Sequence, residues 1–335
     1  MRKLRWGVLG VAKIATAKVI PAMQACEYAE IAAIASRDRA RAESAARELS
    51  IPKAYGSYEA LLADREIDVI YNPLPNHLHV PWSIRAADAG KHVLCEKPIG
   101  MSVRETRELI AARDHTGVTI GEAFMVQVHP QWERAVELVR GGRIGVLRAM
   151  IGRFGYFNPN PENIRNIPEY GGGGLMDIGC YPIKTSRMIF GEEPRRVSGV
   201  MYRDPALGTD TLTSAVLEYP SGQCIFTCST QIVPNQGVQI LGTKARIDFE
   251  IPFNAVPGRV SKIRIDDGSD ITGANIQTEE FAPCDQYTLQ GDRFSRAVLD
   301  QTPPPVPLED SLRNMAVIEA IVRASKSDRW EETAI

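Results

Sequence analysis

The sequence has no excess of charge of one sign and no long hydrophobic run. Its 335 residues include 39 Lys and Arg against 41 Asp and Glu, a formal net charge of −2 at pH 7. Such a chain lacks the overall basic field that attracts nucleic acid or anionic lipid, so neither is expected as a partner. It also contains no stretch of about 18 apolar residues, the length that a membrane-spanning helix requires, and no membrane association is expected.

Cysteines are sparse and scattered. Of the six, only Cys224 and Cys228 are close in sequence, and they lie in a stretch with the alternating pattern of a strand. Four residues apart in a strand, they share a face but are well separated along it, which favours neither a disulfide nor a zinc site. No grouping of His, Cys and carboxylate residues indicates a metal. We expect reduced thiols and, because residues 1–9 leave no room for a signal peptide, a cytoplasmic location.

What the sequence does have is the composition of an ordinary globular protein. Apolar residues make up 44% and charged residues 24%, which excludes wholesale disorder, collagen-like chains and coiled coils. At roughly 100–200 residues per domain, the length predicts two domains.

The first third alternates short apolar runs with segments of helical period. The predicted strands are Leu4–Leu9, Ala29–Ala35, Asp68–Tyr71, His92–Cys95 and Val118–Gly121. The predicted helices are Ile14–Cys26, Asp38–Leu49, His77–Ala89 and Ser102–His115. This alternation predicts an α/β domain with a parallel sheet, helices on both faces, and a ligand at the carboxyl ends of the strands.

After about residue 123 the pattern changes. The predicted strands, separated by turn signals, are Val146–Tyr156, Arg196–Tyr202, Leu212–Glu218, Gln223–Gln231, Gly237–Leu241, Ala245–Phe249 and Ser261–Ile265. Helices are predicted over 130–140, 176–190, 286–299 and 308–324. This half is expected to be an α+β domain with a large, mostly antiparallel, open sheet. The predicted domains are therefore 1–123 and 124–335.

A glycine turn follows the first strand. Gly10, Val11, Ala12, Lys13 and Ile14 connect that strand to the first helix. Gly10 permits a tight turn, the small Ala12 lets the backbone approach a pyrophosphate, and Ala15 allows the helix to pack closely on the strand. Because the turn lies at the first strand of an alternating pattern, it favours dinucleotide binding over an ordinary turn.

The end of the second strand distinguishes NADP from NAD. Ser36 and Arg37 follow Ala35 at the place where an acidic residue is expected for NAD. A guanidinium binds phosphate through two parallel, charge-assisted hydrogen bonds, so we predict NADP in preference to NAD. The alternatives are that Ser36 only caps the next helix, with the arginines solvated, or that Asp38 turns toward the ribose.

Polar residues also follow two later strands, in the segments Tyr71–His79 and His92–Pro98. At strand ends they would face a bound cofactor. The residues expected there are Leu74, Pro75, Asn76, His79, Glu96 and Lys97, although the histidine is also typical of a structural role. A nearby positive ring and partial desolvation would lower the pKa of Lys97 and suit it to proton transfer. On their own, Glu96 and Lys97 are more typical of a surface ion pair.

Several motifs together resemble one family. They are Gly7–Ala15, Ala35–Arg37, Leu74–His79 (Leu-Pro-Asn-x-x-His), Cys95–Pro98 (Cys-Glu-Lys-Pro), Glu122–Met125, His129–Gln131 and Gly172–Tyr181 (Gly-Gly-Gly-Leu-Met-Asp-Ile-Gly-Cys-Tyr). These are similar to the motifs of the Gfo/Idh/MocA family, which includes glucose-fructose oxidoreductase and inositol dehydrogenase. The resemblance implies an NADP-binding Rossmann domain and a second domain whose open sheet commonly forms the subunit interface. It therefore also implies a homodimer or homotetramer, and hydride exchange between NAD(P) and a sugar, ketosugar or related alcohol.

The resemblance also assigns roles to three residues. Lys97 matches the family's catalytic lysine, Asp177 its substrate-orienting carboxylate, and Tyr181 its proton-transferring position. Many members have His at the last position, so Tyr181 places the chain nearer the branch with NADP-dependent xylose dehydrogenase and dimeric dihydrodiol dehydrogenase. If residues 176–190 are helical, Asp177 and Tyr181 share one face. A phenol with a pKa near 10 exchanges protons poorly at neutral pH, and Lys97 nearby would lower that pKa.

Arg165, shortly before the glycines at 171–174, is a further candidate substrate contact, although an arginine in a polar loop is usually solvated. Two alternative functions stay open. One is a glucose-fructose type of enzyme that retains NADP and converts two sugars in turn. The other is a sugar-responsive regulator without turnover, which the presence of Lys97, Asp177 and Tyr181 disfavours.

Overall fold

The computed structural model describes residues 2–334, which form two compact units. The first contains the residues up to Val128 together with Asp285–Leu312, and the second contains His129–Cys284 together with the residues from Arg313 on. The predicted boundary at 123/124 lies close to the first crossing. The return of Asp285–Leu312 to the first unit was not part of that prediction, which treated residues 124–335 as one domain.

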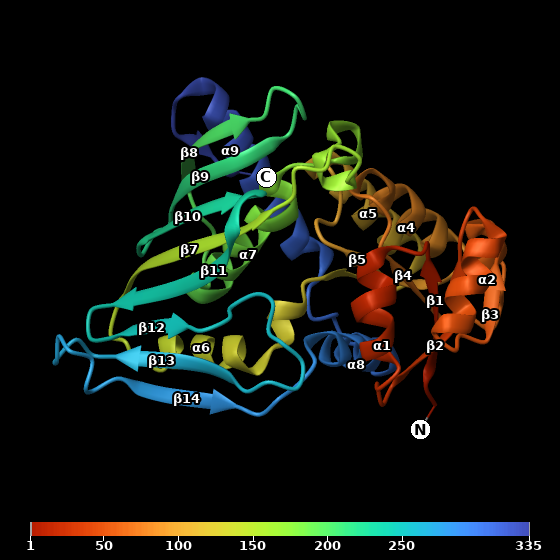
Figure 1. The fold of residues 1–335 in the computed structure, drawn as a ribbon, viewed down its shortest axis with the longest axis horizontal. Coiled ribbons are helices and arrows are strands. Elements are labelled where there is room, and N and C mark those ends of the chain that lie inside the picture. Colours follow the sequence, from red (N-terminus) through yellow and green to blue (C-terminus); the bar gives the residue numbers. More distant parts are fainter. Residues whose placement is uncertain (1, 335) are drawn as a thin grey trace. The chain divides into compact units, whose positions relative to one another are not determined.

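The first unit is built on a six-stranded parallel sheet (Figure 1). Its strands are β1 (Leu4–Leu9), β2 (Ala29–Ala35), β3 (Lys53–Tyr55), β4 (Val69–Asn72), β5 (His92–Glu96) and β6 (Ile120–Ala123). The spatial order β3-β2-β1-β4-β5-β6 is that of a doubly wound dinucleotide-binding fold, with the order reversing between β1 and β4. The predicted Rossmann sheet is confirmed. Strand β3 was missed because its three half-buried residues are too few to show a period.

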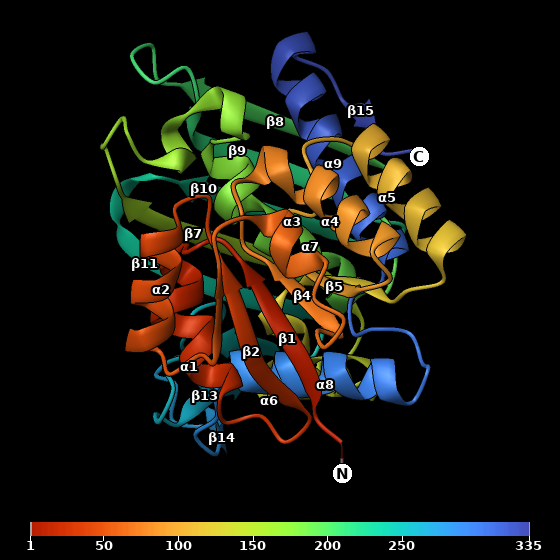
Figure 2. The ribbon, with the colours of Figure 1, turned by 90° about the vertical axis from the view of Figure 1, so that its right-hand side faces the viewer.

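Helices cover both faces of this sheet (Figure 2). They are the π-helical turn Ala15–Val19, α1 (Ile20–Met23), α2 (Arg39–Glu48), α3 (Tyr58–Leu62), α4 (His79–Asp88), α5 (Val103–Thr116) and α8 (Gln286–Leu299), with short 3₁₀ turns at Asn76–Leu78 and Met125–Val128. Side chains cap four of them: Asp38 for α2, Ser57 for α3, Ser102 for α5 and Asp285 for α8. Such caps satisfy amides that a helix start leaves unbonded.

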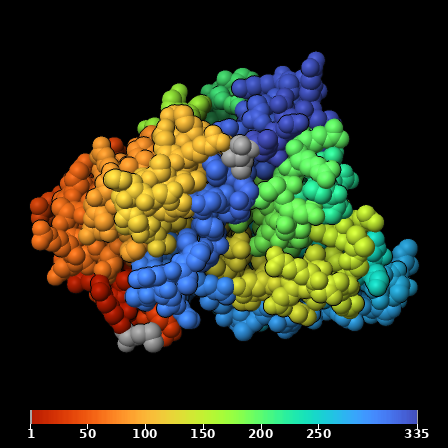
Figure 3. All heavy atoms as spheres, turned by 180° about the vertical axis from the view of Figure 1, so that it is seen from behind, coloured from red at the N-terminus to blue at the C-terminus, as the bar shows by residue number. Residues whose placement is uncertain are grey.

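Helix α8 belongs to the core of the first unit although it is distant in sequence. Trp6 of β1 packs edge-on against Phe294 with 5.5 Å between ring centroids, and its Nε1 donates to Ser295 Oγ at 3.2 Å. A side chain at Gly7, the next residue of the same strand, would instead meet Leu61 of α3. Figure 3 shows the blue atoms of Asp285–Leu312 against the orange and yellow atoms of the first unit, where Arg113 pairs with Glu309 at 2.8 Å.

The second unit is built on a nine-stranded sheet, ordered β14-β13-β12-β11-β7-β10-β9-β8-β15. The strands are β7 (Leu147–Phe157), β8 (Arg196–Arg203), β9 (Asp210–Glu218), β10 (Gln223–Ser229), β11 (Gln231–Gly242), β12 (Arg246–Phe249), β13 (Ser261–Asp266), β14 (Gln277–Phe281) and β15 (Glu331–Glu332). β7 and β10 pair in parallel and the other neighbours are antiparallel, which confirms the predicted sheet.

Helices lie on one face of this second sheet. They are α6 (Pro130–Arg140), α7 (Cys180–Phe190), which continues the π-helical turn Leu175–Gly179, and α9 (Leu308–Ser327); 3₁₀ turns at Ile164–Asn166 and Pro168–Tyr170 precede α7. Side chains placed at Gly152 of β7 and Gly199 of β8 would meet Pro182 of α7 and Ile321 of α9. Among the described residues, none of the helices has the length and apolarity to cross a bilayer.

The opposite face of this sheet carries several exposed apolar residues. Val200 is 68% exposed and Val233 75%. Tyr202, Leu212, Ile225 and Phe157 also lie exposed on these strands. We call these six residues the open sheet face.

Candidate active site

The turn after β1 has the geometry that its sequence predicted. Gly10 has φ +84°, a left-handed conformation that costs glycine little, and its amide donates to Ala35 O at 2.8 Å. A side chain at this position would lie 3.0 Å from Leu74 Cδ2. The backbone of residues 10–14 therefore runs from the carboxyl end of β1 into a helix start, the arrangement that binds a pyrophosphate in dinucleotide folds.

Two arginines lie beside this turn. Arg41 Nη2 donates to Val11 O at 3.2 Å. Burial raises the pKa of the Tyr58 hydroxyl, whereas the guanidinium groups of Arg37 and Arg41 beside it act to lower that pKa. The sequence motifs mark Arg37 but not Arg41 or Tyr58, because a helical arginine and a buried tyrosine show no distinctive pattern.

Asp38 does not extend away from its own helix. Its Oδ1 accepts from Arg41 N at 3.3 Å and so caps α2, while the Asp38 amide donates to Ser36 Oγ at 3.2 Å. The alternative in which Ser36 caps α2 is therefore wrong, because Asp38 supplies the cap. An acidic residue engaged at a helix N-terminus is stabilised there by unbonded amides.

Asn72 and His79 hold the loop after β4. Asn72 is fully buried; its Nδ2 donates to His79 O at 3.0 Å and its Oδ1 accepts from Leu74 N at 3.3 Å. The His79 ring lies between two backbone carbonyls, with Nδ1 2.7 Å from Pro98 O and Nε2 2.6 Å from Leu74 O. Burial lowers the pKa of His79 to about 4. The ring thus links the Leu74-Pro75-Asn76 loop to the turn that follows β5.

That second turn carries Lys97 between two buried carboxylates. Glu96 accepts from Tyr71 OH at 2.7 Å and from the Lys97 amide at 3.3 Å. The Lys97–Pro98 peptide is cis, and Glu122 Oε1 accepts from Ile99 N at 2.8 Å. Lys97 itself is half-buried. Hydrogen bonds therefore fix the backbone on both sides of Lys97. A fixed backbone helps a residue to present its side chain in one accurate position.

In the second unit, Asp177 joins a group of three polar side chains. Its Oδ2 accepts from Tyr156 OH at 2.6 Å and lies 3.1 Å from Arg165 Nε. Burial, followed by the charge of Asp177, raises the pKa of Tyr156. The structure thus brings together the predicted Arg165 and Asp177, and adds Tyr156. The sequence marked Tyr156 only as part of a strand.

Tyr181 follows Asp177 on the same helical segment. It is 5% exposed, and its ring packs on Phe154 and Phe253, each with 5.5 Å between centroids. The predicted helix over 176–190 is continuous but begins as a π turn, Leu175–Gly179. Single π turns occur frequently at functional sites.

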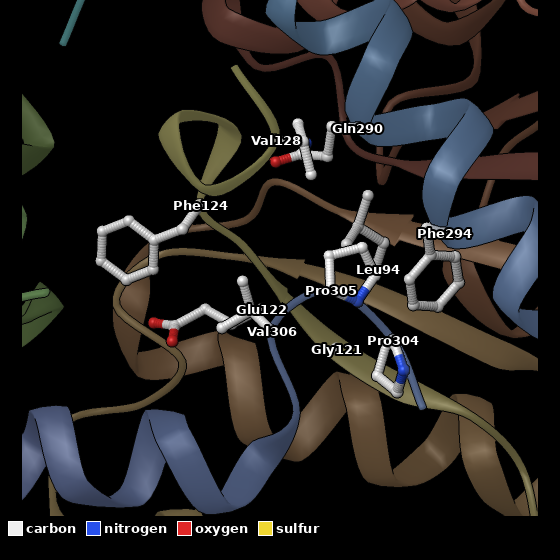
Figure 4. Close-up of a pocket in the computed structure, with 10 residues that line it drawn as sticks. All are labelled: Leu94, Gly121, Glu122, Phe124, Val128, Gln290, Phe294, Pro304, Pro305 and Val306. Carbon is white, nitrogen blue, oxygen red and sulfur yellow. The ribbon is translucent and has the colours of Figure 1, made fainter. Parts of the chain in front are cut away.

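Two cavities, one within each unit, are not lined by Lys97, Asp177 or Tyr181. In the first unit, β5, β6, α8 and Pro304–Val306 enclose about 10 Å³, room for about one water, next to Glu122 and Gln290 (Figure 4). In the second unit, a cavity of about 490 Å³ is lined by Glu193–Arg195, Arg313, Val317 and Glu332–Ala334. It includes none of the predicted site residues.

Comparison with known families gives two matches, one in each half of the chain. Residues 4–124 match the family described as "Oxidoreductase family, NAD-binding Rossmann fold", and residues 132–248 match the "GFO/IDH/MocA C-terminal domain". The chain belongs to the Gfo/Idh/MocA family. It is an oxidoreductase, as the motifs predicted.

Members of the Gfo/Idh/MocA family resemble it over nearly its whole length. The chain is 40% identical to D-xylose 1-dehydrogenase (NADP⁺) 2 of Haloferax volcanii, with 97% of this chain and 98% of the relative covered. Its fold is similar to that of an aldose-aldose oxidoreductase from Caulobacter crescentus, with TM-score 0.91, 27% identity and coverage of 99% and 100%. It is also similar to a 3-ketoreductase from Actinomadura kijaniata in complex with NADP and TDP-benzene, with TM-score 0.89, 28% identity and coverage of 96% and 98%.

Proposed function

We propose that this protein transfers hydride between NADP(H) and a sugar, ketosugar or related alcohol, with Tyr181 and Lys97 as its acid-base unit. The observation that carries the proposal is that one helical segment presents Asp177 and Tyr181 together, with the carboxylate held by Tyr156 and Arg165. The related xylose dehydrogenase, whose name specifies NADP⁺, supports the substrate class and the cofactor.

The residues at the β1 and β2 ends fit NADP. Gly10 leaves the turn open, and Ser36, Arg37 and Arg41 supply a hydroxyl and two guanidinium groups. A 2′-phosphate suits these donors, whereas a ribose hydroxyl is favoured by an acceptor. The acceptor here, Asp38, is engaged in capping α2. The loops at Leu74, Pro75, Asn76, His79 and Glu96 would complete the dinucleotide site.

The bound cofactor would supply the carbon that accepts or gives the hydride. In the oxidation direction, Tyr181 removes the proton of the substrate hydroxyl as the hydride leaves the carbinol carbon, so the alcohol loses two electrons and becomes a carbonyl. Lys97 stabilises the phenolate, and Asp177 and Arg165 hold a neighbouring hydroxyl. Carbonyl reduction reverses these steps.

The direct test is a panel of aldoses, ketosugars, polyols and dihydrodiols assayed by the absorbance of reduced nicotinamide, with NADP and with NAD. We expect turnover of at least one sugar or alcohol, with a higher kcat/KM for NADP. A higher kcat/KM for NAD would contradict the cofactor assignment. No turnover with any member of the panel would favour a regulator.

A second candidate is an enzyme that keeps its NADP bound and converts two sugars in turn. The fold similarity to an aldose-aldose oxidoreductase favours it. Denaturing the purified protein and measuring the nucleotide released separates the two. Stoichiometric release from protein purified without added NADP indicates the retained-cofactor enzyme, and an empty protein indicates exchange with solution.

We also propose that the open sheet face is covered by a second copy of the chain, giving a homodimer or homotetramer. An isolated apolar face of this kind is unusual for a monomer. Light scattering on a sizing column should give a mass of two or four chains, and Val200→Asp should lower it. A monomer at micromolar concentration would contradict the proposal. The structure joins none of the six cysteines, all of them among the described residues, in a disulfide, and this supports the proposed cytoplasmic location.

A further inference from the structure

A buried carboxylate from a distant strand lies against the glycine loop that precedes Asp177. Asp210 is the first residue of β9 and is 5% exposed. Its Oδ2 accepts from the Leu175 amide at 2.7 Å and from Thr213 Oγ1 at 3.2 Å. The contact to Leu175 is made at the residue where the helical segment begins.

This helical segment has no side-chain cap of its own. The residue before it, Gly174, has no side chain to offer, and the first amides of a helix have no partner within the helix. An acceptor at that position satisfies one of them, and a carboxylate is favoured there by the helix dipole. Asp210 therefore acts as a cap supplied from another element, 35 residues further along the chain.

Gly173 makes room for this carboxylate. Its φ is +123°, and a side chain there would have its Cβ 2.1 Å from Asp210 Oδ1, far closer than real atoms approach. The same glycine donates its amide to Arg165 O at 2.8 Å and accepts from the Asp177 amide at 3.0 Å. One residue thus connects Asp210 to the backbone of both Arg165 and Asp177.

We propose that Asp210 is a positioning residue for the reaction: by capping the segment at Leu175 and seating Gly173, it sets the direction in which Asp177 and Tyr181 are presented. The inference rests on the proposed function for its catalytic consequence, but the cap can be measured without turnover. Both the Leu175 amide and the Thr213 hydroxyl donate to one oxygen, Oδ2, so the amide oxygen of an asparagine of the same shape can accept both hydrogen bonds.

The test compares Asp210→Ala with Asp210→Asn and with Asp204→Ala, a matched control. Asp204 also accepts from a backbone amide, that of Ala206, but this amide belongs to its own β8–β9 turn and not to the helical segment at Leu175. In Asp210→Ala we expect at least tenfold faster amide exchange over residues 175–181 and at least tenfold lower kcat. Asp210→Asn should stay within threefold of wild type on both, and Asp204→Ala within twofold. The Kd for NADP, which binds the other unit, should change less than twofold in all three.

Exchange rates and kcat of Asp210→Ala within twofold of wild type would overturn the proposal. So would equal losses in Asp210→Asn and Asp210→Ala while the Kd for NADP is unchanged. If Asp210→Ala does not fold, Thr213→Val repeats the exchange measurement, because it removes the hydroxyl that donates to the same carboxylate oxygen. It should raise the amide exchange rates over residues 175–181, and unchanged rates would count against the proposal. If the wild-type protein turns over no sugar or alcohol, the proposed function fails, while amide exchange still decides whether Asp210 caps the helix.

Discussion

The two units build their functional residues in different ways. In the first, most of the candidate residues lie at or soon after the ends of β1, β2, β4 and β5. In the second, Tyr156, Arg165, Asp177 and Asp210 come from four separate segments that hydrogen bonds bring together. A parallel sheet delivers consecutive strand ends to one edge, so a local motif marks the site. A mostly antiparallel sheet does not bring consecutive strand ends to one edge, so no single local motif marks the site in the second unit.

The two units also differ in how they hold their charged candidate residues in place. Lys97 is fixed through its backbone, by Glu96 and by the Glu122 contact to Ile99. Asp177 is fixed through its side chain, by a hydroxyl and a guanidinium. The comparison predicts that substitutions in the two units affect different steps: cofactor binding in the first and substrate handling in the second, with Lys97 and Tyr181 both needed for turnover.

The largest effect is expected for the acid-base pair. Tyr181→Phe and Lys97→Ala should each lower kcat by about 10²–10⁴, the range for loss of a general acid-base group. The Kd for NADP should be nearly unchanged in Tyr181→Phe. Tyr202→Phe, which removes a hydroxyl from an exposed strand residue, is the matched control and should retain full turnover. Wild-type kcat in either site variant would remove that residue from the mechanism.

The next largest effect should be a loss of stability in acid. We expect it to come from two buried histidines, His79 in the first unit and His129 in the second. Burial lowers the pKa of His79 and of His129 to about 4, from an ordinary 6.5. Between about pH 6.5 and about pH 4, the unfolded chain therefore binds protons that the folded chain does not bind. The free energy of unfolding decreases as the pH falls through this range. A shift of this size corresponds to about 3 kcal/mol per histidine.

Urea unfolding between pH 7.5 and 4.5 measures this dependence. His79→Gln and His129→Gln should each lower the stability at pH 7 but flatten its decline in acid. His115→Gln, at an exposed position, should leave the profile as it is. Identical pH slopes for all four proteins would show that neither buried histidine is responsible.

A smaller effect should distinguish the cofactors. Arg37→Ala should raise the KM for NADP by about 10–100-fold, since hydrogen bonds between charged groups contribute about 1.5–3 kcal/mol. The KM for NAD should hardly change. Arg39→Ala is the control, because that side chain pairs with Glu43. Equal increases for both cofactors in Arg37→Ala would contradict the assignment of a 2′-phosphate to this arginine.

The smallest effect is expected for Tyr156→Phe. It removes one hydrogen bond from Asp177 and should raise the KM for the sugar about fivefold, in line with a net contribution near 1 kcal/mol. NADP binding should be unaffected. A change in the KM for NADP without a change in the KM for the sugar would contradict the proposed role of Tyr156 in substrate binding.

Much of the fold was predictable from the sequence because its elements are periodic. β1, β2, α6 and α8 have the predicted bounds. β3, β14 and β15 were not predicted: β3 and β15 are only three and two residues long, and β14 (Gln-Thr-Glu-Glu-Phe) has no apolar alternation. Periodicity also does not say which sheet a helix covers, so α8 was assigned to the second domain.

The candidate site was predictable only where its chemistry is local. Lys97, Asp177, Tyr181 and Arg37 lie in motifs, and a motif is visible in one dimension. Tyr156 and Asp210 act through hydrogen bonds to residues 21 and 35 positions away. The residues next to Tyr156 and Asp210 in the sequence give no indication of these hydrogen-bond partners, so only the three-dimensional structure could identify the two residues.

The insertion of α8 beneath β1 has a consequence for how the protein is made. Trp6 is translated long before the ring that packs against it, Phe294, which follows most of the second unit in the sequence. During synthesis, the Rossmann half therefore exposes an apolar surface until α8 has been made. Such a surface is prone to aggregation and is bound by chaperones. A gene cut after codon 128 would leave its product in that condition permanently.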